Sequence, residues 1–372
     1  MSDCDLFSLA TKGVQALSPY QPGKPIDELE REYGVSDIIK LASNENPLGP
    51  SDNVIAAIQN ELKDLSRYPD GNAFALKQAL ATKHNVSLEQ ITVGNGSNDI
   101  LEILTRAFVT PEHEVVFSQH AFAVYPIVTQ AVGAKAVVVP AKNWGHDLDA
   151  MQKSITDKTR VVFIANPNNP TGTWLAKDEL ATFLENVPAH VLVVLDEAYF
   201  EFADNDAAAK DYPNGMEWLS SYPNLIVTRT FSKAYGLAGL RVGYSVSHPQ
   251  VADALNRVRQ PFNANSLALC AAVVALADVD YLNEGVSLNA KGMQQLVSSF
   301  DEMNLTYIPS VGNFVCVNVG DKAMKVYDDL LYQGIIVRPV ANYEMPEYLR
   351  VTVGTKEENE RFISALQKVL NK

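Results

Sequence analysis

The chain has 372 residues, of which 47% are hydrophobic and 20% charged, and its formal net charge is −14. This apolar fraction supplies a sizeable core and excludes a largely disordered chain, and the length suits two domains of roughly 150 residues each. The acidic balance disfavours nucleic acid as a partner, because phosphate backbones are bound by clustered lysines and arginines.

The cysteines and the N-terminus indicate where the protein works. Cys4, Cys270 and Cys316 are odd in number and widely spaced, which argues against disulfides and a zinc site and predicts a reducing compartment without a bound metal. The first ten residues lack the basic region and apolar run of a secretory signal. No apolar stretch approaches the roughly 20 residues of a membrane span. We expect a cytoplasmic protein without a membrane partner.

The predicted elements divide the chain in two. Residues 1–50 predict a short helix, a connector, S-P-Y-Q-P-G-K-P, and a strand at D-I-I-K-L. From about 52 to 260, apolar runs alternate with helical patterns, which predicts an α/β sheet with crossover helices. The runs are 90–93, 114–117, 136–139, 160–165, 191–195 and 225–228. V-L-V-V-L is apolar throughout, as in a parallel strand covered on both faces.

After about residue 262 the pattern changes. Helical segments over roughly 264–300 precede three short strand patterns, V-C-V-N-V, G-I-I-V-R-P-V and L-R-V-T-V-G, and a terminal helix. This order predicts a smaller α+β domain. We expect residues 46–261 to form the large domain and residues 1–45 together with 262–372 to form the small one.

Polar clusters follow several strand-like runs, where open α/β sheets bind ligands. In I-T-V-G-N-G-S-N-D-I-L, a strand turns through Gly96 into a helix that begins near Ser97. The free N–H groups of such a helix attract anions, so Ser97 and Asn98 are candidates for cradling a phosphate. The alternative is a glycine turn in which either residue caps the helix. The segment lacks G-K-[ST] and is therefore not a nucleotide P-loop.

Two further clusters end in side chains suited to a heteroaromatic ring. Asp196 closes the apolar run V-L-V-V-L, where an unpaired carboxylate would be costly and a protonated pyridine nitrogen would be a fitting partner. The alternative is that Asp196 caps the following segment. In N-P-N-N-P-T-G, two prolines force an irregular turn that carries Asn169.

Lys233 lies in T-F-S-K-A-Y-G-L-A-G-L-R, directly after an apolar strand-like run. Its amine can form a Schiff base with an aldehyde cofactor, and Ser232, Arg241 and Thr230 can hold that cofactor's phosphate. The alternative is a solvated surface lysine, the commonest situation for this residue type.

The lysine stretch is similar to that of the fold-type-I pyridoxal-phosphate enzymes, especially the class I and II aminotransferases, and the order Asn169, Asp196, Lys233, Arg241 matches theirs. The resemblance implies pyridoxal 5'-phosphate as cofactor and a large domain with a mostly parallel sheet flanked by helices plus a smaller α+β domain. It implies that Asp196 pairs with the pyridine nitrogen, that Asn169 and Tyr199 donate to the phenolic oxygen, and that Lys233 is the base.

The same resemblance assigns two aromatic positions. Phe122, in Q-H-A-F-A-V-Y, matches the aromatic that stacks on the pyridine ring, although many family members read P-T-[YF] where this chain reads H-A-F. A buried core aromatic is the alternative. Arg67-Tyr68-Pro69 resembles a segment whose tyrosine reaches across a homodimer to the neighbour's cofactor phosphate, and a loop tyrosine is the alternative for Tyr68.

Substrate residues follow from the same comparison. Arg350 resembles the arginine that clamps a substrate carboxylate, and strand alternation places it on the face opposite Leu349. Arg338 is a candidate for a second anionic group or, alternatively, a surface arginine. Tyr20 and Asn44 resemble residues that close over the substrate.

The resemblance is strongest, from Pro19 to Gly354, with enzymes that transfer an amino group between histidinol phosphate and 2-oxoglutarate in histidine biosynthesis, through two half-reactions at Lys233. Three alternatives stay open: a broad aminotransferase for aromatic amino acids, a decarboxylase of a phosphorylated amino acid that shares Asp196, Lys233 and Arg241, and a non-catalytic cofactor-binding regulator. The acidic charge and the intact lysine disfavour the regulator.

Overall fold

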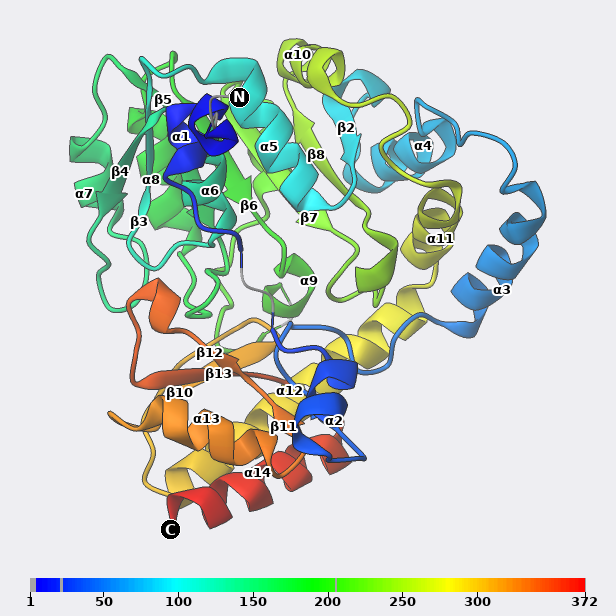
Figure 1. Ribbon diagram of the computed structural model, residues 1–372. Helices are drawn as coiled ribbons and strands as arrows, with labels where there is room; N and C mark the ends of the chain where they lie inside the picture. The colour runs from blue at the N-terminus through cyan, green and yellow to red at the C-terminus, as the bar shows by residue number, and fades with distance from the viewer. Residues whose placement is uncertain (1–4, 21–22, 205, 372) are drawn as a thin grey trace.

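The structure is a computed structural model that describes residues 5–20, 23–204 and 206–371. Its larger part contains a seven-stranded sheet in the order β2-β8-β7-β6-β5-β3-β4, drawn in the upper half of Figure 1. The strands are β2 (Ile91–Gly94), β3 (Glu114–Ser118), β4 (Lys135–Val139), β5 (Thr159–Ala165), β6 (Leu192–Asp196), β7 (Leu225–Thr230) and β8 (Gly243–Ser247). All neighbours pair in parallel except β8, which is antiparallel to β7 and β2.

The larger part also contains the helices α3 (Asp52–Glu61), α4 (Phe74–His84), α5 (Ser97–Phe108), α6 (Val124–Ala131), α7 (Leu148–Lys153), α8 (Lys177–Asn186), α9 (Phe200–Ala203), α10 (Pro249–Val258) and α11 (Ser266–Ala277). They surround this sheet, except α3, which packs on α11 at one edge of the molecule (Figure 1). Strand β6 shows that both sheet faces are buried, because Val193 and Leu195 belong to one apolar cluster and Val194 to another. The fully apolar run 191–195 therefore lies where its composition predicts.

The smaller domain, in the lower half of Figure 1, contains a four-stranded sheet, β12-β13-β10-β9, and a two-stranded sheet, β1-β11. Its strands are β1 (Ile39–Lys40), β9 (Tyr307–Ile308), β10 (Phe314–Asn318), β11 (Ile335–Ile336), β12 (Arg338–Pro339) and β13 (Tyr348–Thr352). Its helices are α2 (Ile26–Tyr33), α12 (Val279–Glu302), α13 (Ala323–Leu331) and α14 (Lys356–Leu370). Thr355 and Glu358 form a capping box at the start of α14, which fixes where this terminal helix begins.

All six apolar runs predicted between residues 90 and 228 form strands, and the short strands and the terminal helix after residue 300 are confirmed. The predicted N-terminal helix is α1 (Lys12–Gln15), which lies against α6 of the larger part, where Gln130 donates to the Gly13 carbonyl. The exact division at 45/46 and 261/262 stays a prediction. Short 3-10 turns lie at Leu6–Leu9, Leu62–Asp64, Leu88–Gln90, Gly215–Trp218, Ala238–Leu240 and Ala341–Tyr343.

Cys270 and Cys316 are free thiols, and Cys4 lies outside the described residues. Within the described ranges, no single helix is long and apolar enough to cross a membrane, and α11 and α12 pass that test only as a pair bent by 81°. The same ranges contain no cluster of three or more His, Cys, Asp or Glu side chains that could hold a metal ion.

Candidate active site

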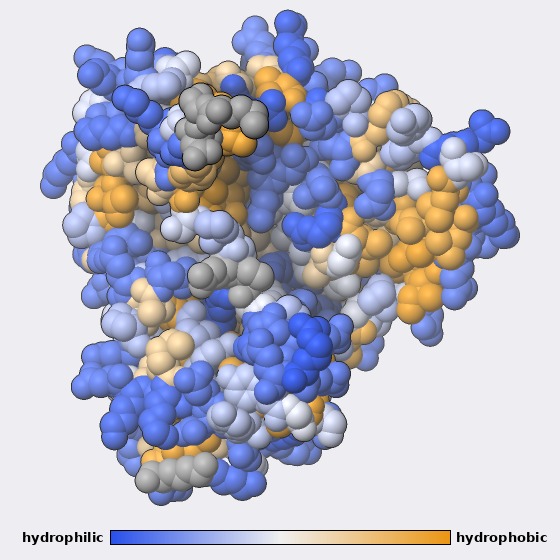
Figure 2. All heavy atoms as spheres, viewed as in Figure 1, coloured by the Kyte–Doolittle hydropathy of each residue, from blue (hydrophilic) through white to orange (hydrophobic). Residues whose placement is uncertain are grey.

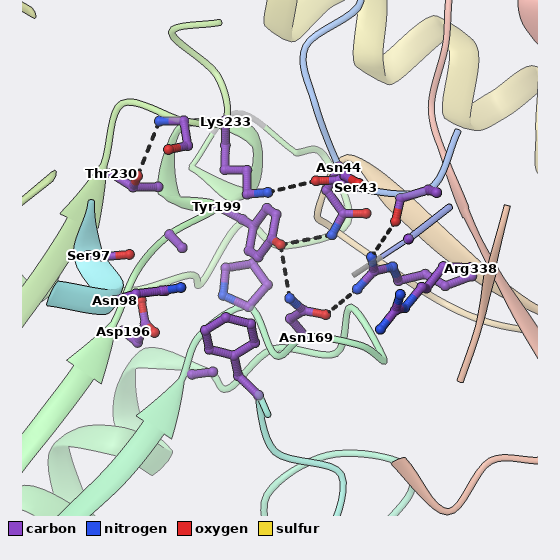
Figure 3. Close-up of a pocket in the computed structure, with 18 of the residues that line it drawn as sticks. Ser43, Asn44, Ser97, Asn98, Asn169, Asp196, Tyr199, Thr230, Lys233 and Arg338 are labelled. Carbon is purple, nitrogen blue, oxygen red and sulfur yellow. Dashed lines mark hydrogen bonds between the residues drawn. The ribbon is translucent and has the colours of Figure 1, made fainter. Parts of the chain in front are cut away.

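One cavity of about 170 Å³ lies at the carboxyl ends of β5, β6 and β7, where they face the smaller domain (Figure 3). Every predicted site residue except Gly96 and Tyr68 lines it: Tyr20, Asn44, Ser97, Asn98, Phe122, Asn169, Asp196, Tyr199, Thr230, Ser232, Lys233, Arg241, Arg338 and Arg350. The parallel strands bring these residues together because their ends meet at one sheet edge, and the smaller domain supplies the opposite wall.

Lys233 projects its amine into this cavity, so the alternative of a solvated surface lysine is wrong. Its Nζ donates to the carbonyl oxygen of Ser43 at 2.9 Å. Removal from water, reinforced by the positive charge of Arg350, lowers the pKa of Lys233 to about 7. A large fraction of this amine is therefore neutral near neutral pH, the form that attacks a carbonyl carbon.

Asp196 is buried at the end of β6 and accepts two hydroxyl hydrogen bonds. The Tyr125 hydroxyl lies 2.8 Å from Oδ2 and the Thr228 hydroxyl 3.1 Å from Oδ1. Burial raises the pKa of Asp196, and the two hydrogen bonds oppose this by favouring the charged form. Tyr199 is the N-cap residue of the short helix α9, and a backbone hydrogen bond at Ala198 also favours the charged form of Asp196, so this carboxylate both faces the cavity and holds the start of the following segment.

Tyr125 is a site residue that sequence reasoning missed. It is fully buried, its ring stacks on Phe163 with centroids 4.5 Å apart, and it also lines the cavity. It lies three residues beyond Phe122, whose ring meets it edge-on at 5.8 Å. The turn into α6 brings the two residues together, because the Tyr125 backbone N–H donates to the Phe122 carbonyl at 3.0 Å.

The segment after β2 forms an anion cradle. Helix α5 begins at Ser97 after Gly96, which has a φ of +84°. A Cβ atom on Gly96 would lie 2.6 Å from Nη2 of Arg241, and one on Gly243 would lie 2.5 Å from the backbone nitrogen of Ser97. Gly96 therefore does not line the cavity but lets the arginine approach the helix N-terminus, where backbone N–H groups attract anions.

Arg241 completes the cradle from the other side. Its Nη1 donates to the hydroxyl of Ser232 at 3.1 Å, and the backbone nitrogen of Ser232 in turn donates to the hydroxyl of Thr230 at 3.1 Å. Helix dipole, hydroxyls and guanidinium thus converge on one corner of the cavity, a donor set suited to a phosphate.

A polar network holds the opposite corner (Figure 3). The side-chain amides of Asn44 and Asn169 donate to the Tyr199 hydroxyl oxygen at 2.8 Å and 3.1 Å. Arg350 Nη1 donates to the side-chain oxygen Oδ1 of Asn169 at 2.6 Å, which fixes the orientation of that amide. Burial raises the pKa of Tyr199 to about 12, so its hydroxyl stays protonated and can donate to a ligand.

Two guanidinium groups enter from the smaller domain. Arg350 donates from Nη2 to the Ala42 carbonyl at 2.7 Å, while its buried Nε has no hydrogen-bond partner among the described residues. Arg350 points into the cavity and Leu349 into the smaller domain's core, as strand alternation predicts. Arg338 is buried and lies 5.7 Å from the centre of the Tyr20 ring, so the alternative of a surface arginine is wrong.

Tyr68 lies away from its own chain's cavity. Its side chain is 82% exposed and stacks on Phe262, with ring centroids 4.7 Å apart. It borders a separate depression of about 520 Å³ between the segment after α3 and helix α11. Tyr68 therefore does not contribute to the site of its own chain.

Comparisons with known proteins place this geometry in a family. The family model of class I and II aminotransferases matches residues 36–366. The chain belongs to this family. It is 63% identical to histidinol-phosphate aminotransferase 2 of Pseudomonas fluorescens, covering 98% of both proteins, and 57% identical to histidinol-phosphate aminotransferase 1 of Idiomarina loihiensis, covering 99% of this chain and 100% of that protein.

A solved structure shows the same fold. The crystal structure of histidinol-phosphate aminotransferase from Sinorhizobium meliloti in complex with pyridoxal-5'-phosphate matches with a TM-score of 0.89 and 32% sequence identity, covering 99% of each chain. The expected fold-type-I architecture, a mostly parallel central sheet with a smaller domain, is therefore confirmed.

The lowered pKa of Lys233 predicts how its reactivity depends on pH. Because only the neutral amine attacks an aldehyde, the rate at which the cofactor-free protein reacts with added pyridoxal 5'-phosphate should rise as pH increases through about 7 and level off above it. Stopped-flow absorbance of the bound cofactor measures this rate. A rate that keeps rising toward the ordinary lysine pKa would contradict the assigned environment.

Tyr125→Phe tests the support of Asp196. The substitution keeps the stacked ring but removes the hydroxyl donor, so the pKa of Asp196 should rise and its charged form should be lost at higher pH than in the wild type. We expect kcat to fall roughly tenfold, with the acid limb of its pH profile shifted upward. Tyr332→Phe, which removes a hydroxyl from an exposed side chain, is the control. An unmoved acid limb would remove Tyr125 from this role.

Proposed function

We propose that this protein transfers an amino group between histidinol phosphate and 2-oxoglutarate, with pyridoxal 5'-phosphate as cofactor, in histidine biosynthesis. One observation carries the proposal: a lysine of lowered pKa and three arginines share one cavity with a buried aspartate. The curated relatives in Pseudomonas and Idiomarina, which are 63% and 57% identical over nearly their whole length, carry the name of this activity.

The residues present fit the cofactor. The phosphate would lie in the cradle of Ser97, Asn98, Thr230, Ser232 and Arg241, where Gly96 leaves room for the guanidinium. A cationic ring nitrogen would neutralise the buried carboxylate of Asp196, whose hydrogen-bond partners in the described part of the chain are neutral groups. Phe122 would cover one face of the ring, and the amide of Asn169 and the hydroxyl of Tyr199 would face its phenolic oxygen.

When bound, pyridoxal 5'-phosphate supplies an electrophilic carbon and an electron-withdrawing ring. Lys233 supplies the proton transfer, because its neutral amine, once free, can accept the proton on the substrate's amine-bearing carbon and return it at a neighbouring position. A cationic ring nitrogen beside Asp196 would favour the ionised carboxylate against the effect of burial, and the carboxylate would in turn keep that nitrogen protonated. The Tyr199 hydroxyl accepts hydrogen bonds from two amides and keeps its own proton, so it would donate to the phenolic oxygen of the cofactor.

The two arginines of the smaller domain fit two kinds of anionic substrate. Arg350 has a buried Nε–H that meets no partner among the residues the structure describes, and a carboxylate or phosphate oxygen would satisfy it. Arg338 and Tyr20 lie beside it at the outer end of the cavity. A site that takes 2-oxoglutarate and histidinol phosphate in turn needs donors for a second carboxylate and for a phosphate, and these residues supply them.

A single-turnover scan of amino donors tests the proposal. The cofactor-loaded protein is mixed with histidinol phosphate, phenylalanine, tyrosine or glutamate, and absorbance follows conversion of the cofactor to its amine form. We expect rapid conversion with histidinol phosphate and glutamate and much slower conversion with the aromatic amino acids. Lys233→Ala should lose nearly all conversion, since removing a catalytic amine costs about 10²-fold or more.

Each other outcome of the scan selects an alternative. Equal rates with phenylalanine and tyrosine would indicate a broad aromatic aminotransferase. Release of carbon dioxide without consumption of a 2-oxo acid would indicate a decarboxylase. Failure of every donor would exclude amino transfer with these substrates, and wild-type conversion by Lys233→Ala would refute the assigned base.

We also propose that two copies of the chain form a homodimer in which Tyr68 reaches the partner's cofactor phosphate. Figure 2 shows apolar side chains gathered on the face that carries α3 and α11. Exposed apolar residues there include Leu62, Leu65, Tyr68, Phe74 and Phe262. A contiguous apolar face is typical of a protein–protein interface, and a homodimer is the commonest assembly that covers one.

Mixed dimers test the placement of Tyr68. When Tyr68→Ala and Lys233→Ala chains are co-expressed with different tags, purified mixed dimers contain one site with both an intact lysine and an intact tyrosine only if Tyr68 serves the partner. We expect such dimers to recover about half of the wild-type turnover per dimer, whereas each parent is nearly inactive. Mixed dimers as inactive as the parents, or a monomer on sedimentation, would contradict the proposal.

A further inference from the structure

The segment between β3 and α6 links the two parts of the molecule. It carries His120 two residues before Phe122. His120 is buried, with 6% of its surface exposed, and it does not line the cavity.

The His120 ring bonds across the domain boundary. Its Nδ1 lies 2.7 Å from the carbonyl oxygen of Tyr343, in the 3-10 turn Ala341–Tyr343 of the smaller domain. Because a carbonyl only accepts, Nδ1 must carry the proton, and it does so in this neutral tautomer and in the charged ring alike. The His120 carbonyl in turn accepts from Asn168 Nδ2 at 3.0 Å, which anchors the histidine to the turn after β5.

An aromatic contact crosses the same boundary. Trp144 lies in a tight turn in which Asn143 and Trp144 have φ values of +50° and +65°, a conformation that bulky residues rarely adopt. The Trp144 indole lies between two rings: its centroid is 5.3 Å from that of His120 and 5.1 Å from that of Tyr348, in β13. A costly backbone conformation persists only where its surroundings fix it, and here the surroundings come from both domains.

The residue held by this bond forms part of the substrate side of the cavity. Tyr343 lines the cavity together with Arg338 and Arg350 and is buried. Both arginines are close enough to act on its hydroxyl electrostatically. Residues 119–122 therefore join Phe122 to the wall at Tyr343, since His120 bonds to the Tyr343 carbonyl and Gln119 donates to the Glu344 carboxylate at 2.5 Å.

We infer that His120 is a positioning residue that holds Tyr343 against the substrate side of the site, so that it determines affinity for the substrate and not the chemistry of the cofactor. The inference rests on the proposed function. The bond from His120 to Tyr343 and the stack through Trp144 to Tyr348 fix the smaller domain's wall relative to Phe122. Without the Nδ1–H donor of His120, the Tyr343 carbonyl loses this hydrogen bond to the larger domain. The substrate must then order the 341–344 turn when it binds, which lowers its affinity.

Two substitutions separate the hydrogen bond from the volume of the ring. His120→Leu removes the donor and keeps an apolar side chain. His120→Asn restores a donor, because its amide nitrogen occupies nearly the position of Nδ1. His190→Leu is the matched control, since exposed His190 also contacts a backbone carbonyl, that of Thr156 at 3.4 Å, but within the larger domain.

We expect His120→Leu to raise KM for histidinol phosphate about five- to tenfold, with kcat and the dissociation constant of pyridoxal 5'-phosphate within about twofold of wild type. His120→Asn should recover most of the affinity, and His190→Leu should match wild type. Hydrogen exchange in the cofactor-free protein gives a second readout. The amides of Tyr343 and Glu344, bonded within their turn, should exchange faster in His120→Leu alone.

The outcomes separate this inference from the proposed function. An unchanged KM in His120→Leu, an asparagine variant as impaired as the leucine variant, or equal losses in kcat and cofactor binding would each overturn the positioning role. If the wild type does not turn over histidinol phosphate, the proposed function fails instead. The KM values of the wild type and the variants are then measured with the amino donor that does react. Unchanged hydrogen exchange in His120→Leu still overturns the inference.

Discussion

The concentration of positive charge in one cavity is the constraint on which the rest of the site depends. Arg241, Arg338, Arg350 and Lys233 share the space, and among the described lining residues Asp196 alone is acidic. Cations brought together out of water disfavour one another, and lysine is the one among them that can release its proton. The pKa of Lys233 is lowered first by its removal from water and then by the positive charges of Arg350 and Arg241, two of the arginines that suit the cavity to anions.

A buried ion pair lies next to the residues of β6 and β7 that face the cavity. Asp196 and Glu197 are consecutive, so strand geometry directs them to opposite sides. Glu197 meets Arg229 at 2.7 Å, and both side chains are almost fully buried. Arg229 also lies 3.4 Å from the centre of the Phe200 ring. Breaking such a buried pair would leave a charge without compensation, so the pair ties β6 to β7 just behind the residues that face the ligand.

Much of this organisation was predictable from the sequence, because the strand ends carry their polar residues directly after apolar runs. The exceptions have physical reasons. Strand β8, G-Y-S-V-S, buries Ser245 and Ser247 and so lacks the apolar run that marks its neighbours. Helix α2 carries Ile26, Leu29 and Tyr33 at helical spacing, but with only eight residues it is shorter than the segments in which a periodic pattern stands out. Tyr125 was missed because a core aromatic and a hydrogen-bond donor to Asp196 look alike in a sequence, and the His120 contact joins residues 223 apart.

Because the surface is negatively charged and the cavity positively charged, the association of an anionic substrate should depend on ionic strength. The chain's net charge of −14 repels an approaching dianion, while the arginines inside attract it. The repulsion acts over the Debye length, roughly 8 Å at physiological salt and about 30 Å in dilute buffer. Added neutral salt should therefore speed the approach of an anionic substrate from solution. Sulfate or phosphate buffers should have a second, opposing effect, since those ions resemble what the guanidinium groups are arranged to hold.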